Sequence, residues 1–145
     1  AWFTHLRSKA MLRKAPKRHL ADPSFAMAVL DRGPEHLLRD PAYFGQLFES
    51  LVVHELRALT GRTVYHARLN TKLEVDAIAN VGGRDVLVEV KLGYTPEVID
   101  HAADTLKRFA AQLEDDPALV VITSGGPALR RNDGVAVIPI GALGP

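Results

Sequence analysis

The stretch LEVDAIANVGGRDVLVEVKL, residues 73–92, decides the fold. Polar residues alternate with apolar and β-branched ones on both sides of the pair Gly82-Gly83. Such alternation is typical of β-strands, and two glycines between two such runs are typical of a tight hairpin. The sequence therefore predicts two antiparallel strands, residues 73–80 and 86–92, on either side of the glycine pair.

The hairpin also predicts which side chains face one another. With a two-residue loop, facing positions add up to 165, so Asp76 lies opposite Glu89 and Glu74 lies opposite Lys91. Because side chains alternate between the two faces of a sheet, Asp76, Glu89 and Lys91 are expected on one face. The apolar residues expected on the other face are Val75, Ala77, Val88 and Val90.

The flanking segments predict two helices and further strands. Asp40 is a candidate N-cap before Pro41, apolar residues follow at three- and four-residue intervals, and Gly61 ends the pattern. Thr95-Pro96 begins a second amphipathic helix. Three further strands are predicted at 64–69, 118–123 and 135–140. The expected fold is α/β: helix, three-strand antiparallel meander, helix, strand and a last short strand.

Length and charge set the domain organisation. The 145 residues are enough for one domain, and they contain no cysteine, which excludes disulfides and thiolate zinc sites and favours the reducing cytoplasm. The net charge of +1 hides an asymmetry: residues 1–21 hold six bases and no acid, and the rest holds 12 bases and 17 acids. We interpret residues 1–33 as a basic leader with a short helix, linked to or left from an upstream region, and residues 34–145 as the domain.

The two facing carboxylates indicate a cation site. Like charges directly opposite on paired strands repel, so Asp76 and Glu89 need positive charge nearby. Lys91 supplies one charge and a divalent cation two. Two carboxylates with a backbone carbonyl and water suit Mg²⁺ (or Mn²⁺), and a neighbouring lysine can activate an attacking water. The alternative is an ion-pair ladder on the solvent face of the sheet.

Glu49 is a third acidic candidate. It lies in the most apolar helix, between Phe48 and Val52, where a lone carboxylate is costly and should have a partner. Gly45 precedes it by one helical turn, and its missing side chain leaves space for a close neighbour.

This set of residues resembles the PD-(D/E)XK, or restriction-endonuclease-like, nuclease superfamily. The core of that superfamily runs helix, three antiparallel strands, helix, strand. The resemblance implies that Glu49, Asp76 and Glu89 bind the metal and that Lys91 activates water. Val75 stands where the superfamily usually has a proline.

A closer resemblance covers nearly the whole chain. Four segments look like the C-terminal domain of prokaryotic AAA-type ATPases of unassigned function: KAPKRHLADPSF (14–25), YFGQLFE (43–49), LEVDA (73–77) and EVKLG (89–93). This resemblance implies an upstream ATPase domain as a partner. The 145 residues themselves contain no Gly-x₄-Gly-Lys-Ser/Thr nucleotide-binding motif.

Together these features predict a Mg²⁺-dependent DNA endonuclease domain that hydrolyses phosphodiester bonds and does not enter membranes. Basic residues of the leader and of a late turn, with one glutamine of the second helix, are expected to contact DNA. These candidate contacts are Arg13, Lys14, Lys17, Arg18, Arg130, Arg131 and Gln112. Two alternatives stay open: a catalytically silent module that docks a partner or regulates the ATPase, and a non-specific nucleic-acid-binding domain.

Overall fold

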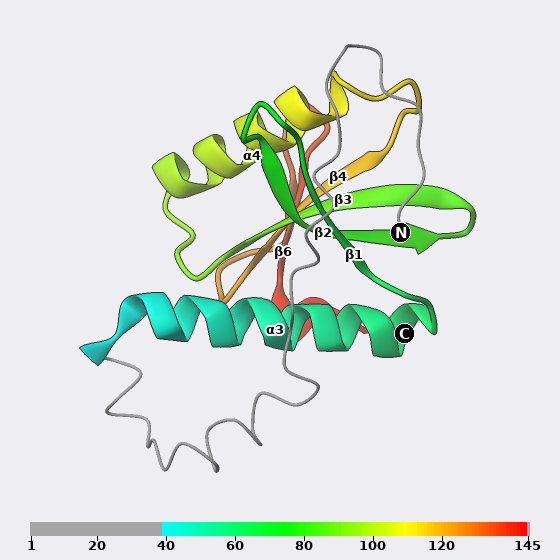
Figure 1. The fold of residues 1–145 in the computed structure, drawn as a ribbon. Helices are drawn as coiled ribbons and strands as arrows, with labels where there is room; N and C mark the ends of the chain where they lie inside the picture. Colours follow the sequence, from blue (N-terminus) through cyan, green and yellow to red (C-terminus); the bar gives the residue numbers. More distant parts are fainter. Residues whose placement is uncertain (1–38, 145) are drawn as a thin grey trace.

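The computed structural model describes residues 39–144, which form a mixed α/β fold (Figure 1). The helices are α3 (Pro41–Thr60) and α4 (Pro96–Ala110). The strands are β1 (Tyr65–Arg68), β2 (Glu74–Val81), β3 (Arg84–Lys91), β4 (Ala118–Thr123), β5 (Leu129–Arg130) and β6 (Ala136–Pro139), with a 3₁₀ turn at Ile140–Ala142. The predicted α/β class and the order of helix, three strands, helix and strand are confirmed. The leader, 1–33, lies outside the described residues.

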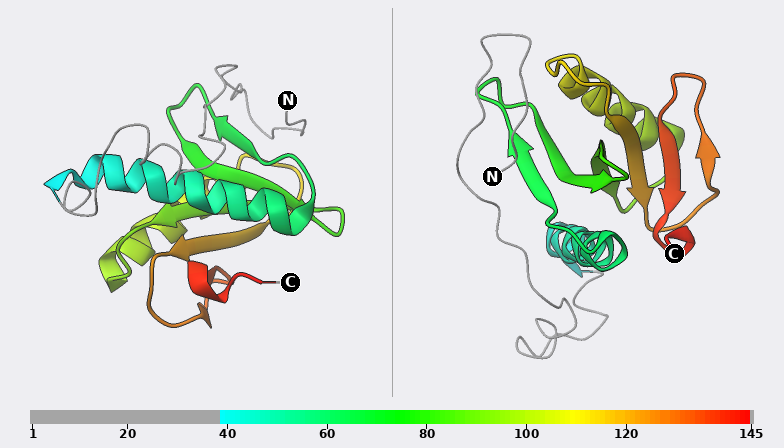
Figure 2. Two further views of the ribbon diagram at one scale, coloured as in Figure 1. Left: turned by 90° about the horizontal axis from the view of Figure 1, so that it is seen from below. Right: turned by 90° about the vertical axis from the view of Figure 1, so that its right-hand side faces the viewer.

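The six strands form one sheet in the order β1-β2-β3-β4-β6-β5. The pairs β1–β2, β2–β3 and β5–β6 are antiparallel, whereas β3–β4 and β4–β6 are parallel. The two helices lie on opposite sides of the sheet (Figure 2). Helix α3 packs with Phe48 and Val52 in a cluster that includes Val88. Helix α4 contributes Phe109 to a second cluster, which includes Leu87.

The predicted ends of α3 are confirmed. The Asp40 side chain accepts a hydrogen bond of 3.1 Å from the backbone N–H of Tyr43, and Pro41 occupies the first turn. Gly61 ends the helix in the left-handed conformation, φ +63°, with its N–H donating to the Arg57 carbonyl.

Helix α4 begins as predicted but is shorter than its apolar pattern suggests. Thr95 caps its N-terminus by accepting a hydrogen bond from the Val98 N–H. The helix ends at Ala110, so Gln112, which we predicted to lie on it, is in the following turn. Leu113 is nevertheless fully buried, because this turn continues to pack against the sheet. Within residues 39–144, neither helix is long and apolar enough to cross a membrane.

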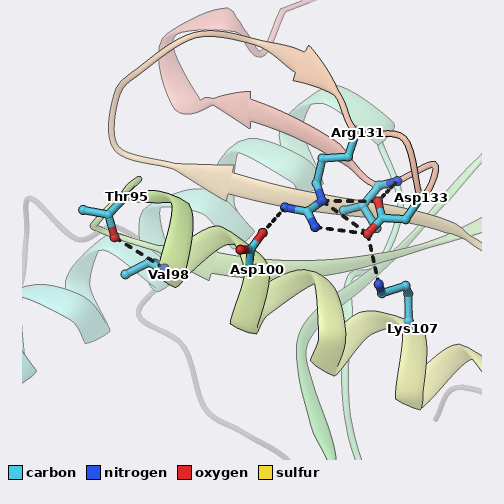
Figure 3. A network of polar contacts seen from close by, with 7 residues as sticks. Thr95, Val98, Asp100, Lys107, Arg131 and Asp133 are labelled. Carbon is cyan, nitrogen blue, oxygen red and sulfur yellow. Dashed lines mark hydrogen bonds and ion pairs between the residues drawn. The ribbon is translucent and has the colours of Figure 1, made fainter.

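The predicted turn at 130–134 is partly strand. Leu129 and Arg130 form β5, which pairs with β6, and the turn itself spans Arg131–Gly134. Asp133 holds this turn to α4 through a network of charges (Figure 3). Its carboxylate lies 3.2 Å from Arg131 Nη2 and 3.0 Å from Lys107 Nζ. Arg131 also lies 2.6 Å from Asp100 on α4. Hydrogen bonds from Arg131, the largest cause, and from Lys107 lower the pKa of Asp133.

Replacing Asp133 by alanine should lower the free energy of unfolding by about 1–2 kcal/mol, because it removes charge-assisted bonds and the acceptor for the Val135 N–H. Since folding lowers the Asp133 pKa, this stabilisation is present above the unfolded pKa, near 3.8, and is lost as the pH falls below it. Urea unfolding at pH 7 and pH 3 measures both effects.

Asp104→Ala is the matched control. It breaks only the exposed Asp104–Arg108 pair, 3.9 Å apart, and should change the free energy of unfolding by less than about 0.5 kcal/mol. Equal effects of the two substitutions would show that the network adds nothing beyond an ordinary surface ion pair.

Candidate functional site

The β2–β3 hairpin has the predicted register. Val81 pairs with Arg84, Asn80 with Asp85, and the pairing continues to Ala77 and Val88, always with positions that add up to 165. Gly82 and Gly83 both have positive φ, +60° and +85°, as a two-residue hairpin loop requires. With this register, Asp76 and Glu89 come directly after the last pair, Ala77 and Val88, at the far end of the hairpin.

The backbone pairing of β2 with β3 stops at Ala77–Val88, next to Asp76. A regular ladder would continue with the Val90 N–H donating to the Val75 carbonyl. Instead, the Val90 N–H donates to Asp76 Oδ2 at 2.8 Å. The Asp76 carboxylate therefore takes the place of a backbone acceptor where the two strands separate.

A β-bulge in β2 accompanies this separation. Tyr65 pairs with Ile78 but Ala67 pairs with Val75, so two steps along β1 match three along β2. The extra residue reverses the alternation of side chains beyond it. Val75 consequently packs in the α4-side cluster with Ile78, and our prediction that it shares a face with Ala77 is wrong.

Glu89 is buried beside Asp76 and Lys91. Its side chain is 7% exposed, and its Oε2 lies 3.3 Å from Lys91 Nζ. The pKa of Glu89 rises from 4.5 to about 7, first because burial disfavours the charged form and next because of the Asp76 carboxylate. Lys91 and the Asp76 backbone amide act in the opposite direction. An exposed ion-pair ladder, the alternative from sequence, does not describe so buried a carboxylate.

Glu49 is not joined to these two carboxylates as a ligand set. Within residues 39–144, no group of three or more His, Asp or Glu side chains is placed to hold a metal ion. Helix α3 lies on the sheet face carrying Val88 and Val90, whereas alternation directs Glu89 to the other face. Glu49 itself is half-buried.

Gly45, one turn before Glu49, has a neighbour at ordinary distance. A Cβ there would lie 3.9 Å from the Leu92 side chain, so an alanine fits and the predicted close approach is absent. The contact nevertheless places the N-terminal half of α3 beside the end of β3.

Three of the predicted DNA contacts, Arg130, Arg131 and Gln112, lie within the described residues. Arg130 is exposed on β5, but Arg131 is bound by Asp100 and Asp133, so its charge is already compensated. Gln112 is half-buried in the turn after α4. The leader contacts, Arg13, Lys14, Lys17 and Arg18, lie outside the described residues.

A side-chain hydrogen bond holds the loops that follow β3 and β4 to one another. The Ser124 hydroxyl donates to the Leu92 carbonyl, and the buried Thr123 hydroxyl donates to the Gly125 carbonyl at 2.8 Å. The pair Gly125-Gly126 follows the parallel strand β4, and ligands of α/β sheets commonly bind beyond the carboxyl ends of such strands.

One comparison with known proteins gives a match, and it spans nearly the same residues as the described fold. Comparison with curated proteins and with solved structures found no match. A family model described as "Domain of unknown function (DUF4143)" matches residues 44–143, a range that includes Asp76, Glu89 and Lys91. The match covers most of the chain, and the protein therefore belongs to the DUF4143 family.

Proposed function

We propose that this domain hydrolyses phosphodiester bonds in DNA with the help of Mg²⁺ or Mn²⁺. The observation that carries the proposal is the fork between β2 and β3, the point beyond Ala77 and Val88 where the two strands separate. There a buried Glu89 of raised pKa lies beside Asp76 and 3.3 Å from Lys91. A carboxylate whose pKa is raised by burial and by a neighbouring carboxylate, and which lies beside a lysine at a strand end, is a candidate catalytic group.

The order of the elements supports a restriction-endonuclease-like arrangement. A helix precedes the meander β1-β2-β3, and α4 connects β3 to the parallel strand β4. We propose that the domain adopts this arrangement and follows an AAA-type ATPase domain, as the four sequence segments suggest.

The oxygen atoms at the fork suit a hard cation. The Asp76 and Glu89 carboxylates are acceptors of the kind that Mg²⁺ binds, and the Val90 carbonyl faces β2 because its N–H does. A bound cation would lower the pKa of its water and neutralise charge on the phosphate oxygens. Lys91 would orient the attacking water and balance the charge that develops on the phosphate.

One observation favours a catalytically silent module instead. The described residues lack a three-carboxylate ligand group, so the site offers two carboxylates where the resemblance implied three. In that case the domain would dock a partner or regulate the ATPase without hydrolysing DNA.

The test compares the protein with Asp76→Asn on supercoiled, linear and branched DNA in Mg²⁺ or Mn²⁺. Asparagine retains an oxygen acceptor for the Val90 N–H but lacks the charge, so it separates ligation from strand geometry. We expect metal-dependent cutting that Asp76→Asn abolishes and that Glu74→Gln, an exposed carboxylate on the same strand, leaves intact. The absence of cutting by the unaltered protein would favour the silent module.

A further inference from the structure

Tyr94 packs against a pair of glycines beyond the ends of β3 and β4. A Cβ added to Gly126 would lie 2.8 Å from Tyr94 Cδ2, and one added to Gly125 would lie 3.2 Å from Cε1. Atoms on both sides of the ring therefore lie close to the glycine pair. Tyr94 is nevertheless 51% exposed, so part of its ring is open to solvent.

The loops that form this surface are fixed to one another. The Ser124 hydroxyl donates to the Leu92 carbonyl, which joins the loop after β4 to the loop after β3. The Thr123 hydroxyl, fully buried, donates to the Gly125 carbonyl. A ring held on such a support loses little conformational freedom when a second ring stacks on it.

Tyr94 lies at the same edge of the sheet as the candidate catalytic lysine. Lys91 ends β3 and pairs in register with Thr123 at the end of β4. Tyr94 follows Lys91 by three residues, and both precede α4. A strand whose phosphate reaches Lys91 therefore has its neighbouring bases within reach of this edge.

We propose that Tyr94 is a stacking platform for an unpaired DNA base, so that the preferred substrate is single-stranded, frayed or branched DNA. This inference rests on the proposed function because it specifies the substrate of the same site. A base in a closed duplex has both faces covered by its neighbours, whereas an unpaired base offers a face to the open side of the tyrosine ring.

The test measures binding without cleavage, in EDTA, by the fluorescence of 2-aminopurine in a short single-stranded oligonucleotide. Stacking on Tyr94 should quench the fluorescence. We expect Tyr94→Phe to retain affinity and quenching and Tyr94→Leu to lose roughly tenfold in affinity together with the quenching. Val81→Ala, which trims an exposed apolar residue at the hairpin tip, should change neither.

An abasic oligonucleotide of the same length isolates the contribution of the bases. Tyr94→Leu should bind it as the unaltered protein does, because only phosphates and sugars remain. Equal losses of affinity for the normal and the abasic oligonucleotide, or no loss for either of them, would overturn the platform. If Tyr94→Leu does not fold, the unaltered protein and Tyr94→Phe still test the proposal. If neither of them quenches the fluorescence of 2-aminopurine, the platform is overturned.

The proposal that Tyr94 stacks on a base and the proposal that the domain cuts DNA can be tested separately. Asp76-dependent cutting without Tyr94-dependent quenching would remove the platform and leave the nuclease. Tyr94-dependent quenching without cutting would support the platform in a domain that binds DNA without hydrolysing it.

Discussion

Replacing Lys91 by methionine should lower the rate of Mg²⁺-dependent DNA cleavage by roughly 10²–10⁴-fold, the range expected when a proton-transfer or charge-stabilising group is removed. Methionine has a similar length and remains compatible with a residue that is one-third exposed. The folded structure should therefore survive, and the loss should lie in the chemical step.

The pH of this measurement matters because Lys91 also acts on Glu89. Lys91 lowers the pKa of Glu89, so its removal raises that pKa above the value of about 7. Cleavage should be compared at about pH 9 and at saturating metal, where Glu89 is ionised in both proteins. A defect that disappears under these conditions would assign Lys91 to the control of Glu89 and not to water activation.

Lys107→Met is the matched control for this substitution. Lys107 is an α4 residue whose ammonium group is 3.0 Å from Asp133, within the network that holds the late turn. Its replacement should lower stability slightly and leave the rate of cleavage unchanged. A comparable loss of activity in both variants would indicate a general requirement for positive charge in DNA binding.

Replacing Glu89 by glutamine should raise the free energy of unfolding at pH 8, by up to about 3 kcal/mol, and change it little at pH 4. The folded pKa of about 7 lies above the ordinary value of 4.5. The native protein therefore holds a proton that the unfolded chain has released, and its stability falls as the pH rises from 4.5 through 7. Glutamine stays neutral and avoids this loss, since one pKa unit corresponds to about 1.4 kcal/mol.

Urea unfolding at pH 4, 6 and 8 measures the effect, with Glu74→Gln as the control. Glu74 is 44% exposed and pairs with Arg68, so its replacement should change stability by less than about 1 kcal/mol at each pH. A Glu89→Gln variant that is less stable than the unaltered protein at pH 8 would mean that the ion pair with Lys91 outweighs the burial of Glu89.

Local signals in the sequence were sufficient for the hairpin and the helix starts. The glycine pair 82–83 determined the register because a two-residue loop leaves one way to pair the strands. Asp40 and Thr95 marked the beginnings of α3 and α4 because their side chains accept from the backbone N–H groups three residues later.

The details of the site depend on packing between distant segments and could not be read from the sequence. The bulge in β2 arises from pairing with β1, and the sequence around Asp76 does not indicate it. The burial of Glu89 depends on how α3 and α4 pack on opposite faces of the sheet. Strand β5 was missed because two residues are too short for any periodicity.

We also expect the two-glycine hairpin to form before the long-range pairs of the sheet. Asp76, Glu89 and Lys91 lie within one pair of consecutive strands, and contacts between such close segments form with little loss of chain entropy. The pairing of β3 with β4 must wait until the chain that includes α4 has closed as a loop. We therefore expect the three side chains to come together early, and Glu89 to acquire its raised pKa only when the later elements bury it. An isolated hairpin would hold the right residues with ordinary acidity.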